Sequence, residues 1–224
     1  MLDSYGMTMM PVLFNDCTVA RAFYKEPVLG PQPEPENGFF GGSSLNSFDV
    51  DTQNGDSIGY SITDEPDMEP EIEEYIRELA KVYGQDDRII IWNIWNELGN
   101  SGRNAMSMPK IIGWLREEDV QQPLTIEMWG AQTDGKNYYE WLHHPKFYGE
   151  VDKENIELSD IITFHFYGDY THARQLITFL KQFNRPLINT EWMHRPFRSL
   201  IQTHLPLWKK EKVGSYFFGL VNGK

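Results

Sequence analysis

Long apolar runs with few polar residues recur along the chain and predict buried strands. Six such runs are present: Met7 to Phe14, Ile89 to Trp95, Leu124 to Trp129, Ile161 to Tyr167, Pro186 to Glu191 and Val213 to Val221. Runs of this kind, without a polar residue at every second position, are typical of strands that are covered on both faces of a parallel sheet. The pattern therefore predicts one buried parallel sheet.

Segments with helical spacing of apolar residues separate these runs. In Pro70 to Tyr83 apolar residues recur at steps of three and four, and Gly84 follows as a stop signal. The other predicted helices are Ser107 to Arg116, with Ser107 as N-cap and Pro109 in its first turn, a short helix at Tyr138 to His143, Thr171 to Phe183, and His204 to Lys212.

The alternation of strands and helices predicts the α/β class. Two architectures have this order, an open doubly wound sheet and a closed (β/α)8 barrel. Gly41-Gly42 lies in a polar loop with no helix after it, and no strand is followed by the glycine-rich turn of dinucleotide-binding sheets. The TIM-barrel type is therefore favoured. Because only about six strand-helix units are visible, we expect a single but partial barrel domain over residues 1–224.

Composition narrows the function classes. The 224 residues carry a net charge of -13 at pH 7, which argues against nucleic acid or an anionic membrane as partner, because both require clustered Lys and Arg. No run approaches the roughly 18 apolar residues of a membrane span, and Met1 to Met10 lacks the pattern of a signal peptide. Cys17 is the single cysteine, so no intrachain disulfide can form, and cysteine content does not indicate whether the protein works in an oxidising or a reducing compartment.

The segment from 15 to 69 is rich in Pro, Gly, Ser, Asn and Asp. Long loops inside compact domains are uncommon, and those that occur are often binding loops. Two interpretations stay open for this segment, a wall of a substrate cleft and a solvated insertion.

Two of the strand-like runs end on a glutamate among aromatic residues, at Glu97 and at Glu191. A charge at the end of a buried strand is poorly explained by folding, because burying an unpaired carboxylate costs free energy. In (β/α)8 barrels the chemistry lies at the carboxyl ends of the strands. The two residues are therefore candidates for an acid/base pair.

Several of these strand ends also carry recognisable motifs. The segments are VLFNDC (12 to 17), WNIWNELGN (92 to 100), FHFYGD (164 to 169), RPLINTEWMHRP (185 to 196) and VGSYFFGLVNGK (213 to 224). In this order they resemble the strand ends of clan A retaining glycoside hydrolases, closest to the family-five-like cellulase and xylanase group. The Asn-Glu dipeptide alone is a weak motif, whereas the ordered set is much more specific.

The resemblance implies a carbohydrate substrate and a retaining mechanism without a cofactor. It makes Glu97 the general acid/base and Glu191 the nucleophile. Tyr167 would hold the nucleophile by a hydrogen bond, Asn96 would bind the sugar 2-hydroxyl, and His165 would line the cleft. Retaining enzymes need the two carboxyl groups roughly 5 to 5.5 Å apart. Secretion or a periplasmic location is compatible with the resemblance, and the sequence does not fix the compartment.

Four aromatic residues are candidate sugar platforms, because the C–H faces of a pyranose stack on aromatic rings. They are Trp95, Trp129, Trp192 and Phe218. For each tryptophan, packing in the core is an equally open interpretation. Phe218 stands where the resembled group usually has a tryptophan, and this loses an indole N–H donor.

Glu127, in the fifth strand of the resembled barrel, is a further charged residue in an apolar run. It is expected to be either an inward-facing polar residue or the partner of an arginine. For metal, Asp134, Glu140, His143 and His144 match no ligand spacing, and the pairs His172/Arg174 and His194/Arg195 lack ligand partners, so no metal site is predicted.

The resemblance covers the third to the eighth strand of a barrel, so we expect exposed sheet edges that can pair with another chain. A homo-oligomer is the resulting hypothesis. Three functional interpretations remain: an active retaining β-glycosidase, a catalytically weak remnant that binds carbohydrate, and an unrelated α/β enzyme in which Glu97 and Glu191 lie far apart.

Overall fold

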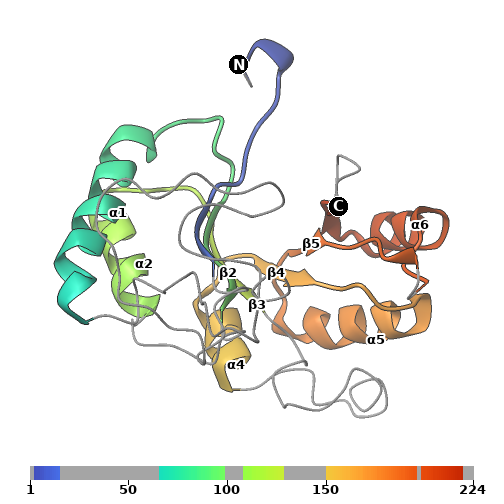
Figure 1. Cartoon of the computed structure of the whole chain (residues 1–224). Coiled ribbons are helices and arrows are strands. Elements are labelled where there is room, and N and C mark those ends of the chain that lie inside the picture. The colour runs from blue at the N-terminus through green and yellow to red at the C-terminus, as the bar shows by residue number, and fades with distance from the viewer. Residues whose placement is uncertain (1–2, 16–65, 99–107, 129–149, 196–197, 219–224) are drawn as a thin grey trace, which may run out of the picture. The chain divides into compact units, whose positions relative to one another are not determined.

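The computed structural model describes residues 3–15, 66–98, 108–128, 150–195 and 198–218. Strands and helices alternate along these residues (Figure 1). The strands are β1 (Val12–Asn15), β2 (Trp92–Leu98), β3 (Leu124–Met128), β4 (Ile162–His165), β5 (Leu187–Glu191) and β6 (Gly214–Ser215). The helices are α1 (Glu69–Tyr83), α2 (Met108–Glu117), α4 (Glu150–Leu158), α5 (Tyr170–Leu180) and α6 (Ile201–Glu211), with short 3-10 helices at Asp3–Tyr5, Pro66–Met68 and Lys181–Phe183.

The chain divides into two compact units, Met1–Leu124 (unit 1) and Thr125–Lys224 (unit 2). In unit 1, β1 pairs with β2 in parallel, with Phe14 opposite Trp95. In unit 2, β4 pairs in parallel with both β3 and β5, and β5 pairs in parallel with β6. The predicted class is confirmed: six parallel strands alternate with helices, consistent with a partial TIM barrel. The expectation of one domain over the whole chain stays a prediction.

Unit 1 buries one face of α1. Ile72, Ile76 and Ala80, at helical spacing, form this face, as the sequence predicts. The helix ends at Gly84, where a side chain would not fit, because a Cβ there would lie 2.4 Å from the Ala80 carbonyl oxygen. On the solvent side, the Arg77 guanidinium binds carboxylates of α1 and of the segment that ends α2, namely Glu73, Glu117 and Glu118.

Unit 2 has its own apolar core, which β4, β5, α5 and α6 share. The buried face of α5 consists of Ala173, Leu176, Ile177 and Leu180. Asp169 caps this helix and accepts hydrogen bonds from the backbone N–H groups of Thr171 and His172. Burial raises the pKa of Asp169, but the hydrogen bonds and charge of His172 outweigh this and the pKa falls below its usual value.

The helix α4 is absent from the sequence prediction. Its sequence, EVDKENIEL, has one clear buried apolar position, Ile156, and its other buried residues include the polar Asp152 and Asn155. A helix that buries polar side chains gives no apolar stripe to read. Arg185 closes its carboxyl end by donating to the carbonyl oxygens of Ile156, Glu157 and Ser159.

Other boundaries differ by a few residues. The last helix, α6, begins at Ile201 instead of His204 and keeps Pro206 inside it. Of the last apolar run only two residues form β6, and the N–H of Tyr216 still donates to the Asn189 carbonyl oxygen of β5 at 2.9 Å. The predicted helix at Tyr138 to His143 lies outside the described residues. Among the helices that the structure describes, none combines the length and apolar character that crossing a membrane requires.

Candidate active site

Glu97, the first predicted carboxylate, lies in β2 of unit 1. The strand continues to Leu98, so Glu97 is its penultimate residue instead of the first residue of a loop. Its backbone φ is +54°, a left-handed value that costs a non-glycine residue free energy and is concentrated at functional sites. The side chain is 8% exposed. A strained backbone therefore presents a nearly buried carboxylate at the end of this strand.

The two residues before Glu97 differ in their surroundings. Trp95 is 3% exposed and packs against Phe14 of β1, with ring centroids 5.1 Å apart. Asn96 is half-buried and pairs in register with Asn15 of β1. In unit 1, Trp95 therefore has a packing role, and its contact with sugar stays a prediction, as does the role of Asn96.

Glu191, the second predicted carboxylate, is the last residue of β5 in unit 2. Its Oε2 accepts a hydrogen bond of 2.5 Å from the Tyr167 hydroxyl. Its backbone carbonyl accepts the N–H of Phe166 at 2.9 Å, so the ends of β4 and β5 are joined next to this side chain. The strand end therefore fixes both the backbone and one carboxylate oxygen of Glu191.

His165, the last residue of β4, contacts two carboxylates with one ring nitrogen. Its Nε2 lies 3.0 Å from Oε1 of Glu127 and 3.4 Å from Oε1 of Glu191. Its side chain is 5% exposed and that of Glu127 is 1% exposed. Unit 2 therefore brings together three predicted site residues, His165, Tyr167 and Glu191.

Glu127 and Thr190 complete this group and are residues that the sequence did not assign to the site. The Thr190 hydroxyl donates to Oε1 of Glu127, the same oxygen that contacts His165. Glu127 is thus an inward-facing polar residue, one of its two expected roles. The signal that points to it is a single charged residue in the otherwise apolar segment Leu124–Met128.

Trp192 lies in the core of unit 2. It is 2% exposed, stacks on His204 with ring centroids 6.2 Å apart, and meets Trp208 edge-on. This is the packing role that the sequence left open, and a contact between Trp192 and sugar stays a prediction. Burial lowers the pKa of His204, whose Nε2 contacts the Gly168 carbonyl oxygen at 3.0 Å. This imidazole therefore sits between the segments that follow β4 and β5.

Backbone contacts hold the segment after β5. The Trp192 carbonyl accepts the N–H of Phe218 at 3.2 Å, and the Met193 N–H donates to the Ser199 hydroxyl at 3.2 Å. Met193 has a φ of +84°, a left-handed value for a non-glycine residue, two positions after Glu191. Phe218 is 46% exposed. Of the predicted platforms that the structure describes, Phe218 is therefore the one with an accessible ring.

Trp129 and four residues considered for a metal site fall outside the described part of the chain. Trp129 follows the last described residue of β3, and Asp134, Glu140, His143 and His144 belong to the same stretch of 129–149. His172 lies in the described part, and its Nδ1 is 2.9 Å from Oδ1 of Asp169, the N-cap residue of α5. This contact gives His172 a structural role at the start of the helix. The role of Trp129 as a sugar platform and the expectation of no metal site both stay predictions.

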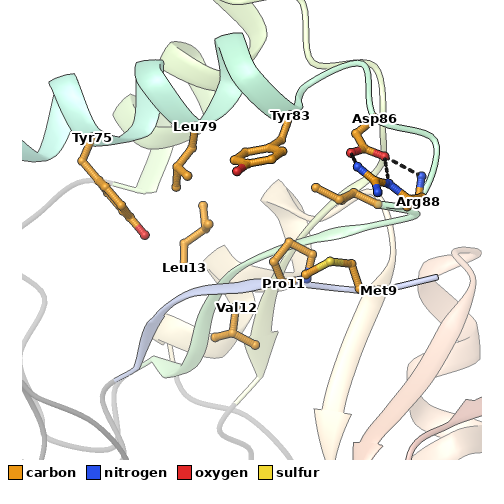
Figure 2. Close-up of a pocket in the computed structure, with 10 residues that line it drawn as sticks. Met9, Pro11, Val12, Leu13, Tyr75, Leu79, Tyr83, Asp86 and Arg88 are labelled. Carbon is orange, nitrogen blue, oxygen red and sulfur yellow. Dashed lines mark hydrogen bonds and ion pairs between the residues drawn. The ribbon is translucent and has the colours of Figure 1, made fainter. Parts of the chain in front are cut away.

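Unit 1 also contains a groove that is lined mainly by apolar and aromatic side chains. Figure 2 shows Tyr75, Leu79 and Tyr83 of α1 facing Pro11, Leu13 and Met9 across a cavity of about 460 Å³. Its charged residues, Asp86 and Arg88, pair with each other (Figure 2), and this ion pair lowers the pKa of Asp86 to about 2. None of the predicted catalytic residues is among the residues that line this groove.

The family of the chain follows from a comparison of sequences. Residues 49–215, more than half of the chain, match the cellulase family, glycosyl hydrolase family 5. The chain belongs to this family. No curated protein matches the chain.

Two similar solved structures are β-glucuronidases of Bacteroides uniformis. A calcium-binding mutant of β-glucuronidase 2 is 17% identical, with a TM-score of 0.46, over 68% of this chain and 22% of that chain. A second β-glucuronidase is 15% identical, with a TM-score of 0.49, over 83% of this chain and 26% of that chain. The present chain thus spans about a quarter of the length of these proteins.

Proposed function

We propose that the chain is a retaining β-glycosidase that acts on a β-linked glycan or oligosaccharide, with Glu97 as acid/base and Glu191 as nucleophile. The observation that carries the proposal is the carboxylate of Glu191, which the Tyr167 hydroxyl holds at the end of β5, with Nε2 of His165 3.4 Å away. The membership of the chain in glycosyl hydrolase family 5 supports a sugar as the electrophile that this carboxylate attacks.

The first half-reaction requires one protonated and one ionised carboxyl group. Glu97 gives its proton to the glycosidic oxygen, which then leaves as an alcohol, while Glu191 attacks the anomeric carbon and forms a covalent glycosyl-enzyme. The hydrogen bond from Tyr167 favours the ionised form of Glu191, because a hydroxyl forms a stronger hydrogen bond with a charged carboxylate than with a neutral carboxyl group.

The second half-reaction restores the enzyme. Glu97, now ionised, takes a proton from a water molecule, the resulting hydroxide attacks the anomeric carbon, and Glu191 leaves as a carboxylate. Two inversions at this carbon give net retention of configuration. Asn96 is proposed to bind the 2-hydroxyl, and the exposed ring of Phe218 is proposed to stack on a sugar face.

A panel of chromogenic β-glycosides tests the proposal on the wild type, Glu97→Gln and Glu191→Gln. Glu154→Gln, an exposed residue of α4, is the matched control for the loss of one carboxylate. We expect turnover in the wild type and the control, and a loss of at least about 10³-fold in both catalytic variants. NMR of the first product is expected to give the retained anomer.

Other outcomes of the same panel lead to the alternatives. Carbohydrate binding without turnover in all four proteins would mean that the chain is a binding remnant of the family. Turnover that survives in both Gln variants would exclude these glutamates as the catalytic pair. Self-association through a sheet edge stays a separate prediction, and light scattering checks it against the chain mass of 26.2 kDa.

A further inference from the structure

Glu127 is a carboxylate in the interior of unit 2. It lies in β3, where every residue from Leu124 to Met128 is buried, and it is 1% exposed. Burying an ionised carboxylate is costly unless hydrogen bonds and an opposite charge compensate for it. Its contacts therefore indicate what this carboxylate does.

The contacts of Glu127 lead to the proposed nucleophile. The hydroxyl of Thr190, the residue before Glu191, donates to Oε1 of Glu127, and Nε2 of His165 lies 3.0 Å from the same oxygen. That Nε2 is also 3.4 Å from Oε1 of Glu191. One ring nitrogen is thus flanked by a carboxylate of β3 and a carboxylate of β5.

This arrangement constrains the proton of the imidazole. An ionised carboxylate has only acceptor sites, so a bare Nε2 would place its lone pair against two negative oxygens. A proton on Nε2 is attracted by both. Among the described residues of unit 2, Glu127 and Glu191 each place a carboxylate oxygen within 4 Å of Nε2 of His165, and Tyr167 binds the other oxygen of Glu191.

We infer that Glu127 is a positioning residue: with its carboxylate held by Thr190, it keeps His165 protonated at Nε2 beside Glu191. The inference rests on the proposed function, in which Glu191 must be ionised when it attacks the anomeric carbon. A donor held next to Glu191 favours that ionised form. In this arrangement Glu127 acts through His165.

NMR of the histidine side-chain nitrogens tests the inference without substrate. In the wild type at pH 7 we expect the chemical shifts of a protonated Nε2 on His165. In Glu127→Gln, which keeps the shape and removes the charge, we expect the titration midpoint of His165 to fall by about one to three pH units. The control Glu154→Gln, with the same charge change on exposed α4, is expected to leave this midpoint in place.

Either of two results overturns the inference: a bare Nε2 in the wild type at pH 7, or the same His165 midpoint in Glu127→Gln and wild type. A bare Nε2 in the wild type overturns the inference even where Glu127→Gln does not fold. A purely structural role of Glu127 predicts an unchanged midpoint.

Turnover provides the separate test of the underlying function. In Glu127→Gln we expect the acid limb of kcat/KM to move to higher pH with little change in KM at the optimum. If the wild type shows no turnover and Glu127→Gln lowers the titration midpoint of His165, the proposed glycosidase function is rejected. The electrostatic effect of Glu127 on His165 is then retained. Normal turnover with an unchanged midpoint would reject this electrostatic effect alone.

Discussion

The hydroxyl of Tyr167 donates a hydrogen bond of 2.5 Å to Oε2 of Glu191, across the parallel pair β4 and β5. In register, His165 lies opposite Glu191 after an irregularity at Phe164 and His165. This shift of pairing lets the chain beyond β4 reach the side chain at the end of β5. A local irregularity of the ladder thus helps to assemble the candidate site.

Replacing Tyr167 by Phe removes this donor and keeps the ring. A hydrogen bond to a charged group contributes about 1.5 to 3 kcal/mol, so kcat/KM is expected to fall by about 10- to 100-fold. The acid limb of the pH profile is expected to move to higher pH, because the ionised form of Glu191 loses a stabilising contact. The steady-state pH profile of the most active chromogenic glycoside provides the measurement.

Tyr170→Phe is the matched control, because Tyr170 is an exposed tyrosine in α5 of the same unit. It is expected to leave both kcat/KM and the acid limb unchanged. Equal effects in both variants would mean that the Tyr167 hydroxyl has no specific role at Glu191.

The sequence located the strands because each apolar run is a local signal, although β2, β4 and β6 end at other residues than predicted. A glutamate at the end of such a run made Glu97 and Glu191 candidates, whereas the role of His165 was assigned from the family resemblance. The left-handed φ of Glu97 has no such signal, since glutamate is not a residue that favours it. Its strain depends on the tertiary structure around it.

The contacts among strands were not predictable in the same way. Glu127, His165 and Thr190 come from three strands, and their meeting depends on the register of each pairing. The helix α4 was missed because its buried face includes Asp152 and Asn155, which a search for apolar periodicity does not count. Sequence thus located single residues, and packing determined their partners.

The buried His204 makes stability depend on pH. Burial lowers the pKa of His204 below its ordinary value of 6.5, so the folded chain binds its proton less readily than the unfolded chain. Stability from this residue is complete above pH 6.5 and is lost as the pH falls from there through the folded pKa. The carboxylates Asp169 and Glu211, whose pKa values are also lowered, lose their contributions as the pH falls below their ordinary pKa values of 3.8 and 4.5.

Urea unfolding at pH 7.5 and at pH 5.5 checks this dependence. The wild type is expected to be less stable at pH 5.5, and His204→Gln is expected to lose most of the difference between the two pH values. A pH dependence in His204→Gln as large as in the wild type would assign it to other groups.

A pair of buried threonines joins β3 and β4. The Thr125 hydroxyl donates to the Ile161 carbonyl oxygen at 2.7 Å, so the contact of 2.8 Å between the two hydroxyls must have Thr163 as donor. Thr125→Val leaves both a carbonyl and a hydroxyl without this partner, and should lower the free energy of unfolding by about 1 to 3 kcal/mol. Thr163→Val removes only a donor and should cost less.

Chemical denaturation of both single variants and the double variant measures this pair. The double variant is expected to be less destabilised than the sum of the single variants, because replacing both hydroxyls leaves fewer buried polar groups unpaired. Strict additivity would mean that the two hydroxyls do not interact.

Two glycines of unit 1 should respond in opposite ways to the same change. Gly84 follows α1, and a Cβ there would lie 2.4 Å from the Ala80 carbonyl oxygen and 3.0 Å from Cγ2 of Val120. The backbone oxygen cannot rotate away, so Gly84→Ala should shift the end of α1 and lower the melting temperature.

At Gly113, inside α2, a Cβ meets nothing within 4 Å. Because alanine favours a helix interior by up to about 1 kcal/mol over glycine, Gly113→Ala should raise the melting temperature. Differential scanning calorimetry of the two variants beside the wild type measures both shifts. Stabilisation by both substitutions would show that the contact at Gly84 relaxes at little cost. Destabilisation by both would mean that the methyl group added at Gly113 clashes with another group, contrary to the open space found there.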